Sequence, residues 1–198
     1  MEAPRGAGHC LPARAAHSIG DPSDGIDLDA SKGAQERTSH MTKTNAMRML
    51  DAAKIQYEIK EYEVDENDLS GKHIAEQIGL PMPQVFKTLV ARGDKTGPLV
   101  FCIPVTGEID LKAAAAITGN KRIEMIQVKE LLGLTGYIRG GVSPIGMKKK
   151  FPTYIDQSAQ NFDRITVSSG TRGAQLLMDR ATLIHFVQAK LANLTNNA

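Results

Sequence analysis

Apolar residues recur at helical spacing in five stretches of the chain. The predicted helices cover residues 43–54, 70–79, 110–117 and 128–134, and a fifth begins at Asp179. Thr44 and Ser70 stand where N-caps are expected, because a hydroxyl oxygen can accept a hydrogen bond from the free amides of a first turn. The last helix is predicted to present Leu183, Val187 and Leu191 on one face.

Alternating or short continuous apolar runs predict strands over residues 57–62, 85–91, 99–105, 122–126, 153–155 and 165–168. Residues 93–98 read Gly-Asp-Lys-Thr-Gly-Pro, which is typical of a hairpin turn between the second and third of these strands. Helices and strands are mixed without strict alternation. The pattern therefore predicts an α+β fold in which helices surround a mixed β-sheet.

Residues 1–40 differ from the rest of the chain. They are rich in Gly, Ala, Ser, Asp and Pro and show no apolar periodicity. Such a composition buries too little apolar surface to offset the entropy of ordering. The segment also lacks the apolar core of a secretory signal, and its acidic residues argue against a mitochondrial presequence. We predict a disordered extension over residues 1–40 and a folded domain over residues 41–198, which begins near Met41.

The composition narrows the classes of protein to consider. The chain has 198 residues, of which 41% are hydrophobic and 5% aromatic, and it contains no Trp, so aliphatic side chains must build the core. No apolar run approaches the roughly 18 residues of a membrane span. Two cysteines, one in the polar extension, predict no disulfide framework and favour a reducing cytoplasm. A net charge of +2 tolerates a polyanionic partner without requiring one.

Lys87 interrupts an otherwise nearly continuous apolar run, Val-Phe-Lys-Thr-Leu-Val at residues 85–90. The period of a strand places it on the same face as Leu89 and Ala91. An ammonium group on an apolar face is costly unless it meets acceptors or water. Two interpretations follow. Lys87 either projects into a polar cleft, where it can bind a carbonyl or phosphate, or reaches solvent from the end of its strand.

A glycine-rich segment covers residues 136–146, Gly-Tyr-Ile-Arg-Gly-Gly-Val-Ser-Pro-Ile-Gly. Glycine lets the main chain approach a ligand closely, and successive amides that point inward can stabilise a developing oxyanion. The spacing of Gly141 and Gly146 superficially resembles a phosphate-binding loop. Met147 stands where that motif requires Lys, so a nucleotide-binding P-loop is excluded. The alternative is an ordinary tight connection between two elements.

A third candidate segment, residues 166–173, reads Thr-Val-Ser-Ser-Gly-Thr-Arg-Gly and follows a predicted strand. Ser168 can donate to a substrate and Arg172 can meet a phosphate, but a plain turn explains the residues equally well. The lysines at 148–150 either follow a nucleic-acid backbone or simply form a solvated surface. Cys102 lies in an apolar strand and is interpreted as a core residue.

Familiar hydrolytic motifs are absent from the sequence. There is no Gly-x-Ser-x-Gly elbow and no Cys-x-x-Cys pair. The histidines of residues 41–198, His73 and His185, have no partner at the spacing of metal ligands. The pattern therefore predicts neither a serine triad nor a zinc mechanism.

Residues 41–198 resemble the YbaK/EbsC family of aminoacyl-tRNA deacylases, relatives of the editing domains of prolyl-tRNA synthetases. The resemblance rests on Val85–Val90, Gly140–Gly146 and Val167–Gly173, and on their order and spacing. It is strongest to the bacterial YbaK branch, which hydrolyses Cys-tRNA(Pro). It implies a mixed, partly barrel-like sheet surrounded by helices, no metal and no dissociable cofactor.

The resemblance also implies which residues surround the substrate. Lys87, Gly140 and Gly141 are predicted to carry catalysis. The predicted substrate-binding residues are Tyr62, Thr88, Val142, Ser143, Pro144, Gly146, Ser168 and Arg172. Because the sequence offers no conventional nucleophile, the predicted nucleophile is the thiol of the cysteinyl ester itself, with a ribose hydroxyl or water as the alternative.

Three functions remain open at this stage. The first is hydrolysis of mischarged Cys-tRNA(Pro) in trans. The second is hydrolysis of Ala-tRNA(Pro) by the same fold, and the third is a catalytically silent tRNA-binding module that assists prolyl-tRNA synthetase. The expected partners are tRNA and, as a candidate, prolyl-tRNA synthetase, and the expected location is the cytoplasm.

Overall fold

The computed structural model describes residues 42–65 and 70–195, which fall in the second of two units, Met1–His40 and Met41–Ala198. The disordered extension predicted for residues 1–40 lies outside the described residues. In chain order, the elements are α1 Asn45–Ala52, β1 Tyr57–Glu61, α2 Gly71–Ile78, the 3₁₀ turn η1 Met82–Gln84, β2 Phe86–Gly93, β3 Gly97–Pro104, α3 Leu111–Thr118, β4 Ile123–Met125, α4 Val128–Thr135, β5 Thr153–Asp156, the 3₁₀ turn η2 Gln157–Asn161, β6 Arg164–Ser168, β7 Ala174–Asp179, α5 Arg180–Phe186 and β8 Lys190–Ala192.

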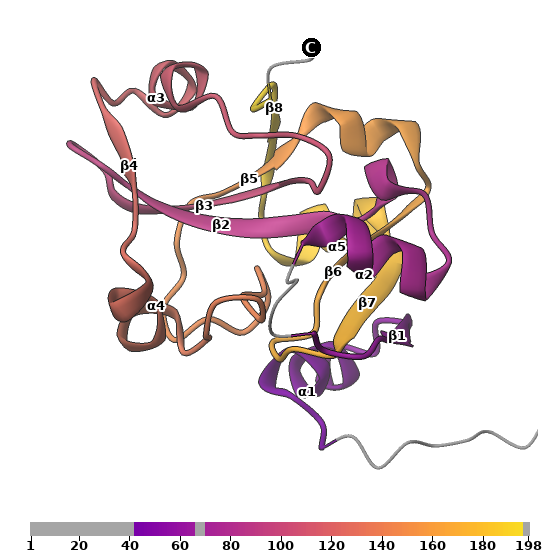
Figure 1. Ribbon diagram of the computed structural model, residues 1–198. Helices are drawn as coiled ribbons and strands as arrows, with labels where there is room; N and C mark the ends of the chain where they lie inside the picture. The colour runs from indigo at the N-terminus through magenta and orange to yellow at the C-terminus, as the bar shows by residue number, and fades with distance from the viewer. Residues whose placement is uncertain (1–41, 66–69, 196–198) are drawn as a thin grey trace, which may run out of the picture. The chain divides into compact units, whose positions relative to one another are not determined.

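The described strands form two sheets (Figure 1). A three-stranded antiparallel sheet has the order β1-β7-β6, and a five-stranded mixed sheet has the order β4-β2-β3-β5-β8. Within the larger sheet, β5 is parallel to both β3 and β8, whereas β2 is antiparallel to its neighbours. A single parallel bridge between Val85 and Thr166 connects the two sheets. The α+β prediction is confirmed, but the partly barrel-like sheet is not, because the described strands stay in two separate sheets.

Local sequence signals explain where the helices begin and end. Thr44 Oγ1 accepts a hydrogen bond from the amide of Met47 at 3.2 Å and caps α1. Ser70 caps α2 in the same way. Gly119 ends α3 with φ +72°, a conformation that costs glycine little because it has no Cβ. The helix boundaries predicted from caps and glycines are therefore confirmed to within one or two residues, except at the last helix.

The C-terminal region differs from its prediction. The helix that begins after Asp179 ends at Phe186, and Leu191 lies in β8 rather than on the helix. The prediction of one long helix was wrong because apolar residues that follow a short helix can coincide with its period. The strand β7 was not predicted at all, because five of its six residues are buried and its sequence has no alternation of apolar and polar positions.

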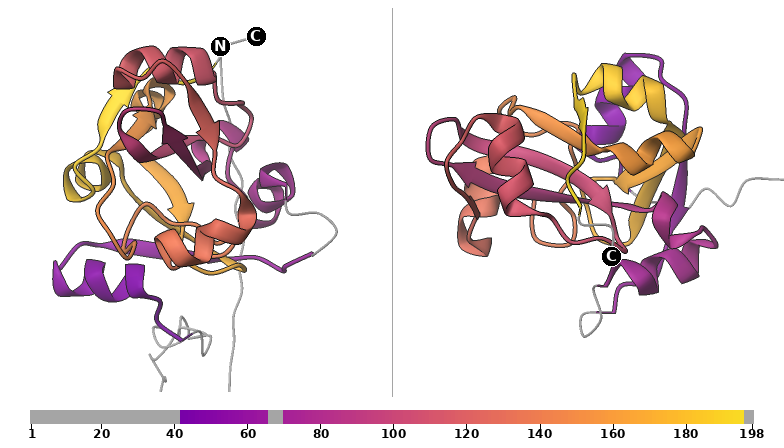
Figure 2. Two further views of the ribbon diagram at one scale, coloured as in Figure 1. Left: turned by 90° about the vertical axis from the view of Figure 1, so that its left-hand side faces the viewer. Right: turned by 90° about the horizontal axis from the view of Figure 1, so that it is seen from above.

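The helices α3 and α4 lie on opposite faces of the larger sheet (Figures 1 and 2). The face under α3 buries Leu89, Ala91 and Phe101 with the alanines of the helix. The face under α4 buries Val90 with Leu131, Tyr137 and Val142, so this second cluster supports the start of the glycine-rich segment. Successive residues of β2 thus point to opposite faces, as the strand period requires.

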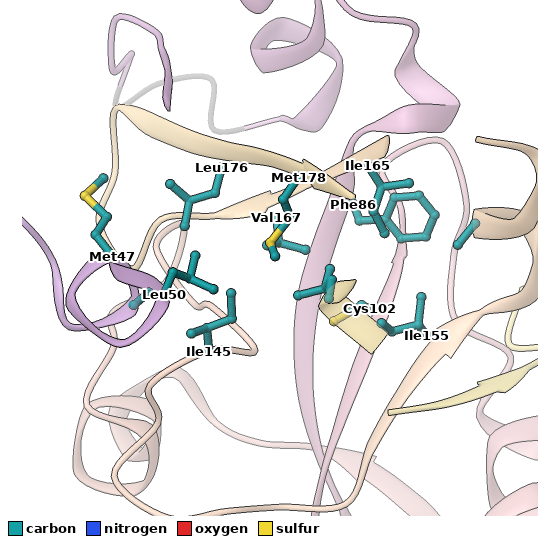
Figure 3. Close-up of a cluster of buried hydrophobic side chains, with 13 residues drawn as sticks. Met47, Leu50, Phe86, Cys102, Ile145, Ile155, Ile165, Val167, Leu176 and Met178 are labelled. Carbon is teal, nitrogen blue, oxygen red and sulfur yellow. The ribbon is translucent and has the colours of Figure 1, made fainter. Parts of the chain in front are cut away.

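A third cluster of buried side chains joins the two sheets and α1 (Figure 3). Met47 and Leu50 of α1 pack against Leu176 of β7 and Ile145 of the glycine-rich segment. Phe86 lies at the other end of the cluster, beside Ile165 and Met178 (Figure 3). This packing fixes the end of β2 that begins at Phe86 against the three-stranded sheet.

Candidate active site

A cavity of about 480 Å³ lies along the outer edge of β2. It is bounded by β2 on one side and by the N-terminus of α2, the α4 region, the glycine-rich segment and the three-stranded sheet on the others. Of the predicted site residues, Lys87, Thr88, Gly140, Val142 and Ser168 line it. Segments far apart in the sequence therefore meet at one cavity, which is the arrangement expected of a substrate site.

The edge of β2 is open where it meets the cavity. The strand pairs with β3 along its whole length, but with β4 only from Ala91 to Gly93. The carbonyl of Val85 accepts from the amide of Val105 on the β3 side, and the carbonyl of Val90 accepts from Ile126 on the other. Because main-chain groups alternate along a strand, the amide and carbonyl of Thr88 point away from β3, toward the cavity.

Lys87 lies in register with Ile103 of β3 and is half-buried. Desolvation by this burial lowers the pKa of Lys87, and the negative charge of Glu108 partly opposes the shift. The side chain lies on the same face as Leu89 and Ala91, as predicted from the strand period. The sequence left open whether Lys87 projects into a cleft or reaches solvent. In the structure it is partly desolvated on its strand, and it lines a cavity that can hold a polar ligand.

The glycine-rich segment packs directly against the loop that follows β6. A Cβ on Gly141 would lie 3.0 Å from the carbonyl carbon of Thr171, and one on Gly140 would lie 3.3 Å from Nε of Arg172. Gly140 also has φ +85°, a conformation that disfavours other residues. Nε of Arg172 donates to the main-chain carbonyl of Arg139 at 3.0 Å. Small residues are therefore required at 140 and 141 for contact between two loops.

The later part of the glycine-rich segment does not line this cavity. Ser143 is buried, and its Oγ accepts from the amide of Ile145 at 3.3 Å. The carbonyl of Gly146 accepts from Nδ2 of Asn45 at 2.8 Å, which ties the segment to α1. Pro144 and Gly146 line a different pocket, of about 400 Å³. These three predicted binding residues thus lie outside the lining of the cavity, and the hydrogen bonds of Ser143 and Gly146 help to hold the loop in place.

Three more predicted residues, Tyr62, Arg172 and Gly141, are not part of the cavity lining. The amide of Tyr62 donates to the carbonyl of Gly173 at 2.9 Å and continues the pairing of β1 with β7. Arg172 reaches back to the glycine-rich segment. Gly141 is one residue beyond Gly140 and contacts the main chain of Thr171.

Ser168 and Gln175 face each other across the β6–β7 pair, and both line the cavity. Oγ of Ser168 accepts from the amide of Gly170 at 3.3 Å, so its hydroxyl hydrogen is available to a ligand. Gln175 is only 5% exposed, and its Oε1 has no hydrogen-bond partner among the described residues. Sequence reasoning missed Gln175 because it missed β7. Arg139, which also lines the cavity, was not singled out from its loop.

The structure offers no activated protein nucleophile among its described residues at this site. Burial raises the pKa of the Cys102 thiol to about 12, and the thiol lies 3.7 Å from the hydroxyl of Thr88. A thiol with so high a pKa carries almost no thiolate at neutral pH. Neither His73, on α2, nor His185, on α5, lines the cavity.

Two further observations concern the described residues. They contain no group of three or more His, Cys, Asp or Glu side chains that could hold a metal ion. None of their helices is long and apolar enough to cross a membrane.

Comparison with known sequences identifies relatives over most of the folded unit. Residues 69–186 match the model of the aminoacyl-tRNA editing domain. The chain is 46% identical over 153 residues to the "Putative Cys-tRNA(Pro)/Cys-tRNA(Cys) deacylase EbsC" of Enterococcus faecalis. The aligned residues cover 77% of this chain and 93% of that protein. It is also 29% identical over 131 residues to the "Uncharacterized protein YwhH" of Bacillus subtilis, with 65% and 82% covered.

Solved structures share the same fold. One described as a "putative trans-editing enzyme for prolyl tRNA synthetase" superposes with a TM-score of 0.69 at 24% identity, covering 79% of this chain and 100% of that one. The hypothetical protein APE2540 superposes with a TM-score of 0.70 at 17% identity, covering 77% and 100%. Identities this low support the fold alone. The family model and the EbsC relative carry the assignment: the chain belongs to the aminoacyl-tRNA editing domain family.

Proposed function

We propose that this protein hydrolyses mischarged aminoacyl-tRNA in trans and that its substrate is Cys-tRNA(Pro). The observation that carries the proposal is the cavity at the open edge of β2, where Lys87, Thr88, Gly140 and Ser168 meet. These groups are hydrogen-bond donors or lie beside main-chain donors, and a donor-rich cavity suits an ester carbonyl that becomes an oxyanion. The name of the 46% identical relative supports the choice of amino acid and tRNA.

The proposed nucleophile is the thiol of the substrate. Sulfur attacks the ester carbonyl carbon, the carbon–sulfur bond forms, and the bond to the ribose oxygen breaks. The thiol proton passes to the departing ribose oxygen, which becomes a hydroxyl, and water then opens the resulting thiolactone to cysteine. An ordinary thiol pKa of about 8.5 leaves some thiolate at neutral pH, and attack within one molecule has a large effective concentration. The protein then has only to orient the ester and stabilise the oxyanion.

Lys87 is the proposed charged donor to that oxyanion. Its burial weakens the competition of water for the ammonium group, so its interaction with a developing negative charge is stronger than at a solvated surface. The outward amide of Thr88 and the main chain at Gly140 are the proposed neutral donors. The amide of Gly141 donates to the carbonyl of Ile138 at 3.0 Å, so the proposed part of Gly141 is to hold Gly140 in place. Cys102 is not assigned a role, because its thiol is fully buried.

Two other functions predict different behaviour. An Ala-tRNA(Pro) deacylase needs a ribose hydroxyl or water as its nucleophile, because alanine has no thiol. A silent tRNA-binding module that assists prolyl-tRNA synthetase needs neither Lys87 nor a shaped cavity. The half-buried lysine in the lining favours the deacylase over the silent module, because a desolvated charge is costly to keep without a use.

The proposed partners are tRNA and prolyl-tRNA synthetase, and the proposed location is the cytoplasm, where charged tRNA is used. The test is the release of free amino acid from Cys-tRNA(Pro) and Ala-tRNA(Pro) by the purified protein. The wild type is expected to deacylate Cys-tRNA(Pro) and to act far more slowly on Ala-tRNA(Pro). Lys87→Ala should lose on the order of 100-fold in rate, whereas Lys112→Ala, a change at an exposed lysine of α3, should not. No release from either tRNA would refute the deacylase proposal.

A further inference from the structure

Gln175 has an unsatisfied acceptor in the wall of the cavity. It lies on β7, the middle strand of the smaller sheet (Figure 1), between Ser168 of β6 and Lys60 of β1. The residue is only 5% exposed, and its Oε1 accepts no hydrogen bond from the described residues. A buried carbonyl oxygen without a partner is unfavourable. A residue that keeps such a group beside a cavity is expected to use it on a ligand.

The other polar side chains of the lining are donors or are already engaged. Lys87 and Arg139 are the charged residues of the described lining, and both can only donate. Oγ1 of Thr88 lies 3.7 Å from Sγ of Cys102, and Oγ of Ser168 accepts from Gly170. The carboxamide of Gln175 is therefore the strong acceptor that the described lining leaves open.

The carboxylate of β1 that shares a face with Lys60, the partner of Gln175, does not serve this purpose. Glu58, two residues before Lys60 on β1, is paired with Lys60 at 3.2 Å and with Arg164 at 2.8 Å. Its side chain is half-exposed, and it is not part of the cavity lining. An amino group bound in the cavity thus meets a neutral amide rather than a carboxylate among the described lining residues.

An aminoacyl ester presents two kinds of polar group. Its carbonyl oxygen is an acceptor and matches the donors of the cavity. Its α-amino group is a donor and needs an acceptor. We propose that Gln175 recognises the α-amino group of the aminoacyl moiety, with its carboxamide turned to present Oε1. The inference rests on the proposed binding of aminoacyl-tRNA, and it makes Gln175 a residue that selects for amino acids over other acyl groups.

The test measures binding of two uncleavable ligands by calorimetry. One is 3′-cysteinylamino-3′-deoxyadenosine, and the other is its 3-mercaptopropionyl counterpart, which keeps the thiol and carbonyl but lacks the α-amino group. The wild type is expected to bind the first on the order of 10-fold more tightly, as one hydrogen bond to an amine can supply. Gln175→Leu should remove this preference, and Gln175→Met is made alongside it in case the branched side chain impairs folding.

Thr166→Val is the matched control. Thr166 lies on β6, and its buried Oγ1 also lacks a partner among the described residues, but it does not line the cavity. The control should keep the wild-type preference. The inference is overturned if the wild type binds both ligands equally or binds neither, or if folded Gln175→Leu or Gln175→Met keeps the preference. Deacylation of Cys-tRNA(Pro), measured separately, tells failure of this inference apart from failure of the proposed function.

Discussion

Nε of Arg172 donates a hydrogen bond to the main-chain carbonyl of Arg139 at 3.0 Å, and so joins the loop after β6 to the glycine-rich segment. Arg139 and Gly140 line the cavity, whereas Arg172 does not. The sequence left two interpretations of Arg172 open, a phosphate contact and a plain turn. The structure shows a side chain that supports the main chain of the cavity wall.

Arg172→Ala should therefore loosen the cavity wall without unfolding the protein. A single partly exposed hydrogen bond contributes about 1 kcal/mol to stability, so only a small fall in melting temperature is expected. The rate of deacylation should fall by roughly 10-fold, because the proposed donor at Gly140 depends on this support for its position. Arg122→Ala, which removes an exposed arginine paired with Glu124, is the control and should change neither quantity. Wild-type turnover in Arg172→Ala would show that the link has no role in catalysis.

Gly141→Val should damage activity by moving the two loops apart. The added Cβ would lie 3.0 Å from the carbonyl carbon of Thr171, and a main-chain atom cannot yield as a flexible side chain does. Such overpacking is expected to lower the free energy of unfolding by about 1–3 kcal/mol. The proportional fall in turnover is expected to be larger than the proportional fall in stability. Thermal melts and single-turnover rates measure the two effects.

Gly133→Ala is the matched control for that substitution. Gly133 lies within α4, and a Cβ there would meet nothing within 4 Å. Alanine should leave turnover unchanged and stabilise the helix by about 0.5–1 kcal/mol. If Gly141→Val behaves like this control, the glycine-rich segment is only a connector.

The charge of Lys87 should depend on Glu108. Burial lowers the pKa of Lys87 below its usual 10.5, and Glu108 acts in the opposite direction. Removing that negative charge in Glu108→Gln should lower the pKa of Lys87 further. Because the ammonium form is the proposed donor, the deacylation rate of the variant should then decline at a lower pH than that of the wild type. Titration of selectively labelled lysine by NMR follows Lys87 directly.

Glu124→Gln provides the comparison, since Glu124 is exposed and paired with Arg122. It should leave the titration of Lys87 unchanged. An unaltered or raised pKa of Lys87 in Glu108→Gln would contradict the account of its electrostatics.

Removing residues 1–40 should leave both the melting temperature and the deacylation rate nearly unchanged. The expectation comes from composition, since the segment has no apolar periodicity with which to pack. The family match, over residues 69–186, also begins well after it. A large loss of either quantity in a protein that starts at Met41 would show that the extension has a structural or catalytic role.

Sequence reasoning located the helices better than the C-terminal strands. Among the described helices, α1, α2, α3 and α5 have hydroxyl or carboxylate caps, and α2, α3 and α4 end at a glycine. Such signals act locally, as at Thr44 and Gly119. By contrast, β7 is buried on both faces, so its sequence has no period to detect. The strand β8 has only three residues and depends on a parallel partner, β5, that lies far away in the sequence. Pairing over such a distance is a tertiary effect that local patterns do not contain.

The same limit applies to the site. Lys87 and the glycine-rich segment could be found because a charge in an apolar run and a cluster of glycines are local anomalies. Gln175 could not, because its meaning depends on the partner missing from Oε1 and on the cavity beside it. Pro144 and Gly146 belong to the same cluster of glycines and were predicted to bind substrate, but they line a separate pocket. The local pattern marks the loop without showing which of its residues face the cavity.

The central claim is that the thiol of the substrate attacks its own ester while the protein supplies donors. The most direct measurement compares single-turnover deacylation of Cys-tRNA(Pro) and Ser-tRNA(Pro), which differ in a thiol and a hydroxyl, by the wild type and by Cys102→Ala. The account predicts that Cys-tRNA(Pro) is cleaved at least on the order of 100-fold faster than Ser-tRNA(Pro), because a hydroxyl is a far weaker nucleophile at neutral pH. It also predicts that Cys102→Ala keeps most of this activity. Equal cleavage of the two tRNAs, or an inactive but folded Cys102→Ala, would contradict it.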